Sequence, residues 1–303
     1  MSGHRVRRRL LAGLLGSALG GAALRPAPAA ASSVPALGAQ STAAAAAATS
    51  AALRVGVIPY LPPATTVRQF QPLREHLSAR LQRPVQVFTA ADFRALAASA
   101  RDGRYELVSL PIHLARMAAL DWNHRILART AGPPVQLVLL TLRNRPLAEP
   151  AQLRGERVGA FDAISITALT LQRWLAAHAL QPGRDVTVEM LRTVAGVLIA
   201  LDRGEIRAAA VARSHIAHLS ADTLAQYTVA ATLGDAGRLL WTSPPGVPAA
   251  EADRIRDALL GYDNPIEIAR GGPAHSFETT SLRDTEVAEP FMLEARRLLA
   301  EGR

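Results

Sequence analysis

The sequence predicts an α/β protein built as two lobes. Apolar runs of strand length alternate with stretches whose apolar residues recur at helical spacing, and this alternation starts at Leu53 and again at Arg157. The 303 residues, 49% of them hydrophobic, are enough for two lobes that each bury a core. Ligands of open α/β sheets bind beyond the carboxyl ends of the strands. We therefore expect a ligand cleft between the lobes, at the loops after Ile58, Val108 and Phe161.

The order of the elements follows from the spacing of the apolar residues. The first unit should contain strands at Leu53–Ile58, Val85–Phe88 and Glu106–Ser109, and helices at Phe70–Leu81, Phe93–Ala100 and Ile112–Leu120. After the apolar run Val135–Leu142, the second unit should contain strands at Arg157–Phe161, Val186–Met190, Ile206–Val211 and Tyr227–Thr232, and helices at Leu169–Leu175 and Val194–Leu201. Helices at Ala249–Leu260 and near Val287–Leu299 should complete the chain. Thr193 is expected to cap the helix after it, and Gly204 and Gly261 are expected to end helices.

Residues 1–31 are typical of an export signal. Basic residues from Arg5 to Arg9 precede an apolar run from Leu10 to Leu24, and Ala29-Ala30-Ala31 fits a cleavage site. The segment 7–11 (RRRLL) fits the twin-arginine pattern, while the leader as a whole also fits an ordinary Sec signal. Retention as an uncleaved anchor is disfavoured because glycines interrupt a short apolar run. We therefore expect a periplasmic protein.

The rest of the chain divides into a linker and a folded body. Residues 32–52 are nearly all Ala, Ser, Pro and Gly, which predicts a disordered linker. In the body we expect the first part of lobe one at 53–134, lobe two at 135–237, and a return to lobe one with C-terminal helices at 238–303. No segment of the body has eighteen apolar residues without a charge, so we expect no membrane-spanning helix there.

The charge pattern and two missing residue types exclude several classes of function. Five arginines lie in the acid-free leader, and without them the net charge of +9 falls to +4, which disfavours nucleic-acid binding. The absence of lysine excludes a Schiff base or a P-loop lysine. The absence of cysteine excludes disulfides, thiol catalysis and a lipidated cysteine anchor. No hydrolase, zinc-protease or dinucleotide-binding motif is found, so we expect a protein that is not an enzyme and has no cofactor.

Six segments match those of a known family in order and spacing. They are 53–59 (LRVGVIP), 70–77 (FQPLREHL), 105–111 (YELVSLP), 153–162 (LRGERVGAFD), 204–211 (GEIRAAAV) and 241–245 (WTSPP). Over residues 53–282 the chain resembles the periplasmic phosphate/phosphite/phosphonate-binding proteins of ABC transporters, a type II periplasmic binding protein family. The resemblance implies a two-lobed fold with the ligand cleft between its lobes. It also implies that the protein captures a small oxyanion and delivers it to a membrane permease, and we expect it to act as a monomer.

The family holds its oxyanion at a Ser/Thr-rich turn that opens a helix, and the resemblance places this turn at 164–168 (ISITA). Ser165 and Thr167 stand where the family has two serines, while Ile166 and Ala168 replace a threonine and a glycine. Free N–H groups and the helix dipole favour an anion at such a turn. The alternative is that Ser165 only caps the helix.

Five further positions bear on the ligand. A family histidine aligns with Val194 and a family acid aligns with Ala212, which leaves specificity for phosphonate open. Arg213 offers bidentate donors to an oxyanion, or is a solvated surface arginine. Tyr60 follows the first strand, where the family often has a hydroxyl, or only packs at the lip of the cleft. Ser109 ends the third strand and donates to the ligand, or only completes a local turn.

Several alternatives stay open at this point. His215 and His218, with Asp222, have a spacing that suits a metal, but ordinary surface histidines are favoured. Phosphate, phosphite, alkylphosphonate, sulfonate and an organic carboxylate are all compatible ligands. A role in transport is favoured over an anion sensor that reports to a signalling partner. We expect the chain to cross between the lobes near 133–140 and 238–244 and to hinge there.

Overall fold

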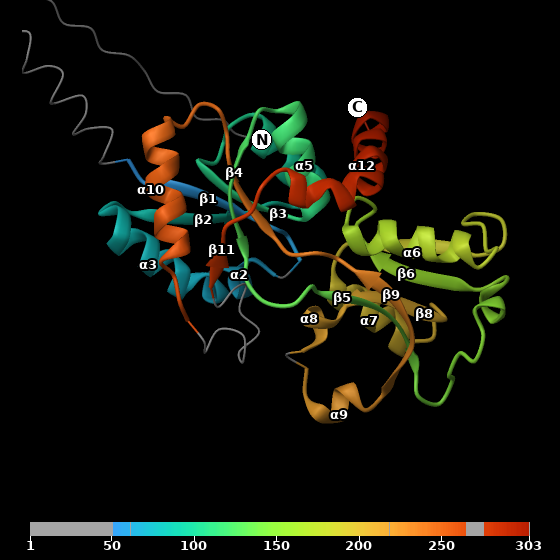
Figure 1. Cartoon of the computed structure of the whole chain (residues 1–303). Coiled ribbons are helices and arrows are strands. Elements are labelled where there is room, and N and C mark those ends of the chain that lie inside the picture. Colours follow the sequence, from blue (N-terminus) through green and yellow to red (C-terminus); the bar gives the residue numbers. More distant parts are fainter. Residues whose placement is uncertain (1–50, 61, 218, 265–275, 303) are drawn as a thin grey trace, which may run out of the picture. The chain divides into compact units, whose positions relative to one another are not determined.

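Two β-sheets organise the structure (Figure 1). The computed structural model describes residues 51–302 apart from 61, 218 and 265–275, and every element below lies in the unit Ala46–Arg303. Sheet A has the strand order β11-β4-β10-β3-β1-β2, and sheet B has the order β7-β6-β8-β5-β9. The predicted α/β class is therefore confirmed, and the two sheets correspond to the two expected lobes. The predicted export signal lies outside the described residues, as does almost all of the predicted linker.

Sheet A is built from the two ends of the described chain. Its strands are β1 (Leu53–Val57), β2 (Val85–Thr89), β3 (Leu107–Leu110), β4 (Arg125–Thr130), β10 (Leu240–Ser243) and β11 (Phe277–Glu278). Strand β1 runs parallel to β2 and β3, whereas β10 is antiparallel to β3 and β4. The associated helices are α2 (Pro63–Gln69), α3 (Gln71–Leu81), α4 (Phe93–Arg101), α5 (Ile112–Asp121) and α10 (Ala249–Leu260). The ring of Trp241 on β10 is fully buried in the core that α3 and α10 cover.

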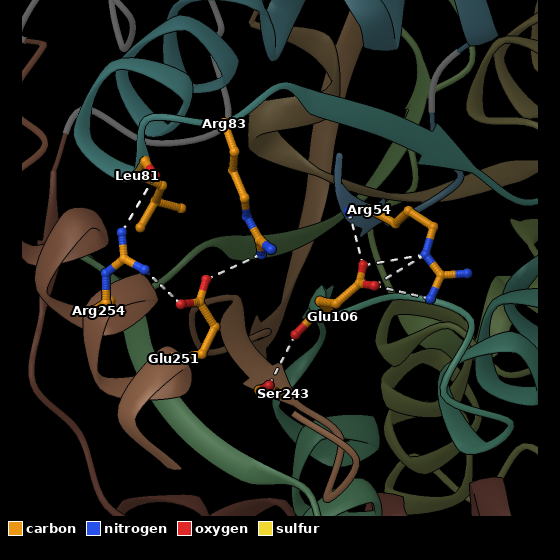
Figure 2. Close-up of polar contacts among 7 residues, drawn as sticks. All are labelled: Arg54, Leu81, Arg83, Glu106, Ser243, Glu251 and Arg254. Atoms are coloured by element: carbon orange, nitrogen blue, oxygen red, sulfur yellow. Dashed lines mark hydrogen bonds and ion pairs between the residues drawn. The ribbon is translucent and has the colours of Figure 1, made fainter. Parts of the chain in front are cut away.

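Polar contacts join neighbouring strands and helices of this sheet, as Figure 2 shows. The Arg54 guanidinium on β1 pairs with the Glu106 carboxylate before β3 at 2.9 Å, and the Arg54 backbone N–H donates to the same carboxylate. The Ser243 hydroxyl on β10 donates to the Glu106 carbonyl at 2.9 Å. Helix α10 is joined to the end of α3 because Glu251 pairs with Arg83. These contacts stabilise the packing of the strands and helices of sheet A. None of their residues lines the cavity described below.

Sheet B is built from the middle of the chain. Its strands are β5 (Gln136–Leu142), β6 (Arg157–Phe161), β7 (Thr187–Leu191), β8 (Ala208–Ala212) and β9 (Tyr227–Asp235). The associated helical segments are η1 (Pro150–Leu153), α6 (Ile166–Ala177), α7 (Val194–Asp202), α8 (Arg213–Ile216) and α9 (Ala221–Leu224). All five residues of β8 are buried, and four of them are alanines, which allows helices to pack closely over the sheet. Thr193 accepts a hydrogen bond from the N–H of Gly196 at 3.0 Å, which confirms its predicted role as a cap.

Two short segments connect the sheets. Residues 131–135 run from β4 to β5, and residues 236–239 run from β9 to β10. Backbone hydrogen bonds join the two segments, with Ala236 N–H donating to the Val135 carbonyl at 2.8 Å and Val135 N–H donating to the Gly237 carbonyl at 3.3 Å. The expected crossings at 133–140 and 238–244 were too long, because residues 136–140 and 240–243 already belong to buried strands. We call 131–135 and 236–239 the crossing segments.

The C-terminal part contains η2 (Arg283–Ala288) and α12 (Glu289–Glu301), where a single helix near 287–299 was expected. Helix α12 contacts helices that belong to both sheets. Arg296 pairs with Asp121 of α5 at 2.8 Å, and the Arg173 guanidinium of α6 lies 5.2 Å from the Phe291 ring centre. Among the described residues, no helix is long and apolar enough to span a membrane.

Candidate functional site

A cavity of about 660 Å³ lies where the strand ends of both sheets meet the crossing segments. Its walls come from the loops after β1 and β3 of sheet A, from the loops after β6 and β8 of sheet B, and from both crossing segments. Each of these four chain segments contributes at least one lining residue, in the same order Tyr60, Pro111, Ser165 and Arg213. The position is the one expected for a ligand of open α/β sheets, beyond the carboxyl ends of the strands.

Helix α6 begins in the wall of this cavity. Ser165 is its N-cap: the hydroxyl accepts a hydrogen bond from Ala168 N–H at 3.1 Å and donates one to the Phe161 carbonyl at 2.7 Å. Ser165 therefore caps the helix, which was the alternative to its predicted role in ligand binding. The backbone N–H groups of Ile166 and Thr167 have no hydrogen-bond partner among the described residues, as is usual in a first helical turn. The turn thus presents two backbone donors and the Thr167 side chain to the cavity.

The loop before this turn is held by helices of sheet A. Phe93 N–H, at the start of α4, donates to the Asp162 carboxylate at 2.9 Å, and the His113 imidazole of α5 donates through Nε2 to the Ile164 carbonyl at 2.9 Å. Burial raises the pKa of the Asp162 carboxyl, although the N–H groups of Phe93 and Ile164 act in the opposite direction. Burial lowers the pKa of His113 to about 4, against the effect of its bond to the Ile164 carbonyl. Both lobes therefore determine where the turn lies.

The residues after β8 bring a cation and an aromatic ring to the cavity. Strands β6 and β8 are parallel neighbours, so Arg213 and His215 lie at the same sheet edge as the turn that opens α6. Arg213 is exposed and has no ion-pair or hydrogen-bond partner in the part of the chain that the structure describes. The His215 ring stacks on Tyr60, with ring centres 4.9 Å apart and planes 18° apart, and meets Phe161 edge-on at 5.7 Å.

A second arginine, Arg238, lines the cavity from a crossing segment and is held there by an ion pair. It donates to the Gly132 carbonyl of the other crossing segment at 2.8 Å and pairs with Glu278 of β11. The same carboxylate accepts a hydrogen bond from Arg129 at 2.7 Å. Arg238 therefore ties the two crossing segments to sheet A, whereas Arg213 has no ion-pair partner among the described residues.

Five of the six predicted site residues line the cavity: Tyr60, Ser165, Ile166, Thr167 and Arg213. The structure does not bring the sixth, Ser109, to the cavity. Ser109 lies within β3, in register with Trp241 of β10, and is fully buried, while Pro111 reaches the cavity instead. Ser109 is buried because β3 continues to Leu110 and both residues pair with β10, so that Ser109 lies inside the strand and not at its end.

Sequence reasoning missed several polar or charged lining residues, one of which lies in a crossing segment while the others lie in α2, β5, α8 and β9. They are Gln69, Gln136, Asp235, Arg238 and His215. The expectation of an ordinary surface histidine was wrong for His215, which is half-buried in the cavity wall. His218, its proposed metal-binding companion, lies outside the described residues, and no group of three metal-ligating side chains occurs among the residues that are described.

Comparisons with known proteins identify the family and the fold. The family model described as "ABC transporter, phosphonate, periplasmic substrate-binding protein" matches residues 55–285. The fold is similar to PhnD1 from Prochlorococcus marinus in complex with methylphosphonate, with a TM-score of 0.69 and 13% identity over 81% of this chain and 98% of that one. It is also similar to PA3383 from Pseudomonas aeruginosa, a binding protein component of an ABC phosphonate transporter (TM-score 0.68, 12% identity, 83% and 96% coverage).

A third solved structure, XAC2383 from Xanthomonas citri bound to chloride ion, matches with a TM-score of 0.67 and 18% identity over 81% of this chain and 99% of that one. At these identities the likenesses concern the fold. They confirm the predicted two-lobed type II periplasmic binding protein fold, with sheets A and B as the centres of the two lobes.

Proposed function

Because the chain belongs to the periplasmic substrate-binding proteins of phosphonate ABC transporters, we propose that its cavity binds a small oxyanion and that the loaded protein delivers it to a membrane permease. The observation that carries the proposal is the juxtaposition of the α6 turn with Arg213 at one edge of sheet B. Backbone N–H groups at a helix start, a hydroxyl and an unpaired guanidinium are the donors that an oxyanion needs.

Each residue has a distinct role in this proposal. The N–H groups of Ile166 and Thr167 and the Thr167 hydroxyl donate to the oxygens, and Arg213 supplies the compensating charge. Ser165 keeps the turn in place, because its hydroxyl already makes two hydrogen bonds within the protein. Tyr60 stacks on His215, so it joins lobe one to the wall that carries Arg213. The proposed role is binding without catalysis or a cofactor.

The proposed location and state follow the family. Residues 1–31 act as the export signal, by the twin-arginine or the Sec route, and the mature chain works in the periplasm as a monomer. Cell fractionation and light scattering of the purified chain test both statements. Full-length chain confined to the cytoplasm, or a stable dimer at micromolar concentration, would contradict them.

Calorimetric titration of the purified full chain with methylphosphonate, phosphate, a sulfonate and acetate tests the binding site. Arg213→Gln should weaken binding of the preferred anion about tenfold or more, since a hydrogen bond to a charged group contributes about 1.5–3 kcal/mol. Thr167→Val should also weaken it, with little change in shape. The matched control is Arg104→Gln, which alters an exposed arginine outside the cavity and should leave the affinity unchanged.

Two outcomes would refute the proposal. One is that none of the anions binds to the unmodified chain. The other is that Arg213→Gln and Thr167→Val both bind the preferred anion as tightly as the Arg104→Gln control does. In either case the fold assignment would stand, because it rests on the strand order and not on these side chains.

A further inference from the structure

The cavity is much larger than a bare oxyanion. Phosphate and methylphosphonate have five heavy atoms each and displace only a few water molecules, each of which takes about 30 Å³ in the liquid. A cavity of about 660 Å³ instead falls within the range of roughly 300–1,000 Å³ that is usual for organic ligands. Most of the space would stay unfilled if the ligand ended at its anionic head.

The cavity is not large because the two lobes stand apart. Tyr60 of lobe one is in ring contact with His215 of lobe two, with centres 4.9 Å apart. Asp162 accepts the N–H of Phe93 at 2.9 Å, which joins the loop after β6 to helix α4. The lobes therefore already touch through residues that line the cavity, and the cavity volume is measured with these contacts in place.

Away from the α6 turn the lining includes Gln69, Gln136, Asp235 and Arg238, but most of the residues that the crossing segments contribute are apolar. The first crossing segment and the start of β5 contribute Pro133, Pro134, Val135 and Leu137, and the second crossing segment contributes Ala236 and Leu239. Such side chains offer no hydrogen bonds to replace the water around a bare inorganic anion. They do gain from contact with carbon atoms, since burial of apolar surface is favourable.

We infer that the ligand of this site is an oxyanion that carries an apolar organic substituent of several carbon atoms. The head lies at the α6 turn and Arg213, and the substituent lies against the crossing segments. The inference rests on the proposed function, because it assumes that the anionic head binds at the turn. It adds that the apolar wall, and not the turn alone, selects the ligand.

A homologous series of ligands tests the inference on the unmodified full chain. Phosphate and methyl-, propyl-, hexyl- and phenylphosphonate are titrated by calorimetry at one pH. Each methylene that becomes fully buried should tighten binding about fourfold, so hexylphosphonate should bind at least tenfold more tightly than methylphosphonate. The heat-capacity change on binding should become more negative along the same series, because it reports burial of apolar surface.

A size variant tests where the substituent lies. Ala236→Phe places a ring in the crossing-segment wall and should abolish most of the gain from methyl to hexyl while leaving methylphosphonate within about threefold of its native affinity. Ala177→Phe makes the same change at an exposed position of α6 outside the cavity and should retain the full gain. An equal gain in both variants would overturn the assignment of the substituent to the crossing segments.

The failures of the two proposals are distinguishable. If no member of the series binds and neither the sulfonate nor acetate binds, the proposed function fails. If phosphate or methylphosphonate binds as tightly as hexyl- and phenylphosphonate, the anion site stands and the apolar substituent is refuted. This arm needs no variant, so a folding defect of Ala236→Phe does not affect it.

Discussion

The stability of this protein should depend on pH through His113, which lies on α5 and is completely buried. Its Nε2 donates to the Ile164 carbonyl at 2.9 Å, while its Nδ1 is buried without a hydrogen-bond partner among the described residues. A second proton would give the buried His113 ring a positive charge and leave its Nδ1–H without an acceptor. Burial therefore lowers the pKa of His113 from 6.5 to about 4. The contribution of the neutral ring to stability is complete above about pH 6.5 and is lost as the pH falls towards 4. At about 1.4 kcal/mol per unit of pKa, the loss is about 3 kcal/mol.

Urea denaturation at several pH values, from about pH 7 to about pH 4.5, measures this effect against His113→Asn. The asparagine amide retains a donor for the Ile164 carbonyl but does not titrate, so the variant should lose about 2–3 kcal/mol less than the native chain over the same range. His178→Asn, at an exposed position at the end of α6, is the control and should follow the native chain. Parallel pH profiles for the native chain and His113→Asn would refute the argument, whatever their absolute stabilities.

Four further outcomes are expected. Ser165→Ala removes the α6 cap and the bond to the strand before it, and should lower the free energy of unfolding by about 1–2 kcal/mol in urea melts. Asp162→Ala leaves Phe93 N–H without its partner and should cost about 1–3 kcal/mol; a change below about 0.3 kcal/mol would contradict this. Gly56→Ala should cost about 1–3 kcal/mol, because its new methyl group would lie 2.4 Å from the Tyr105 ring. Small-angle X-ray scattering should show a smaller radius of gyration with a saturating ligand, and no compaction with a tight ligand would contradict hinge motion.

Much of the fold was predictable because its elements are local. Short apolar runs such as β1 and β6 are recognisable as strands because each is followed by a stretch whose apolar residues recur at helical spacing. Gly261 ends α10 and Thr193 caps α7 through neighbours within a few residues, so the sequence alone indicates them. Strands β4 and β11 were missed because their residues are partly polar and become strands only through pairing with β10 and with each other.

The site was predictable where it depends on a turn and a strand end. Ser165, Thr167 and Tyr60 are found at the cavity because each follows directly from its own strand or helix. Arg238 was not predictable, since its partners Gly132 and Glu278 are distant in sequence and only the pairing of strands brings them together. Ser109 was misplaced for the same reason, because the strand that covers it begins more than a hundred residues later.

The same long-range contacts give the turn at α6 a property that its sequence does not show. The turn is the proposed anion site of lobe two, yet its preceding loop is held by lobe one, through Phe93 N–H on Asp162 and His113 on Ile164. Separation of the lobes would break both hydrogen bonds. The Asp162 carboxylate and the His113 imidazole would then need water as a partner, at a cost comparable to a few hydrogen bonds. The closed arrangement therefore places the turn where Arg213 and the crossing segments can share one ligand. Loss of that arrangement would disturb the loop from which the donors of the turn project. At the proposed site, ligand binding and lobe contact are coupled because both depend on the four residues of backbone between β6 and α6.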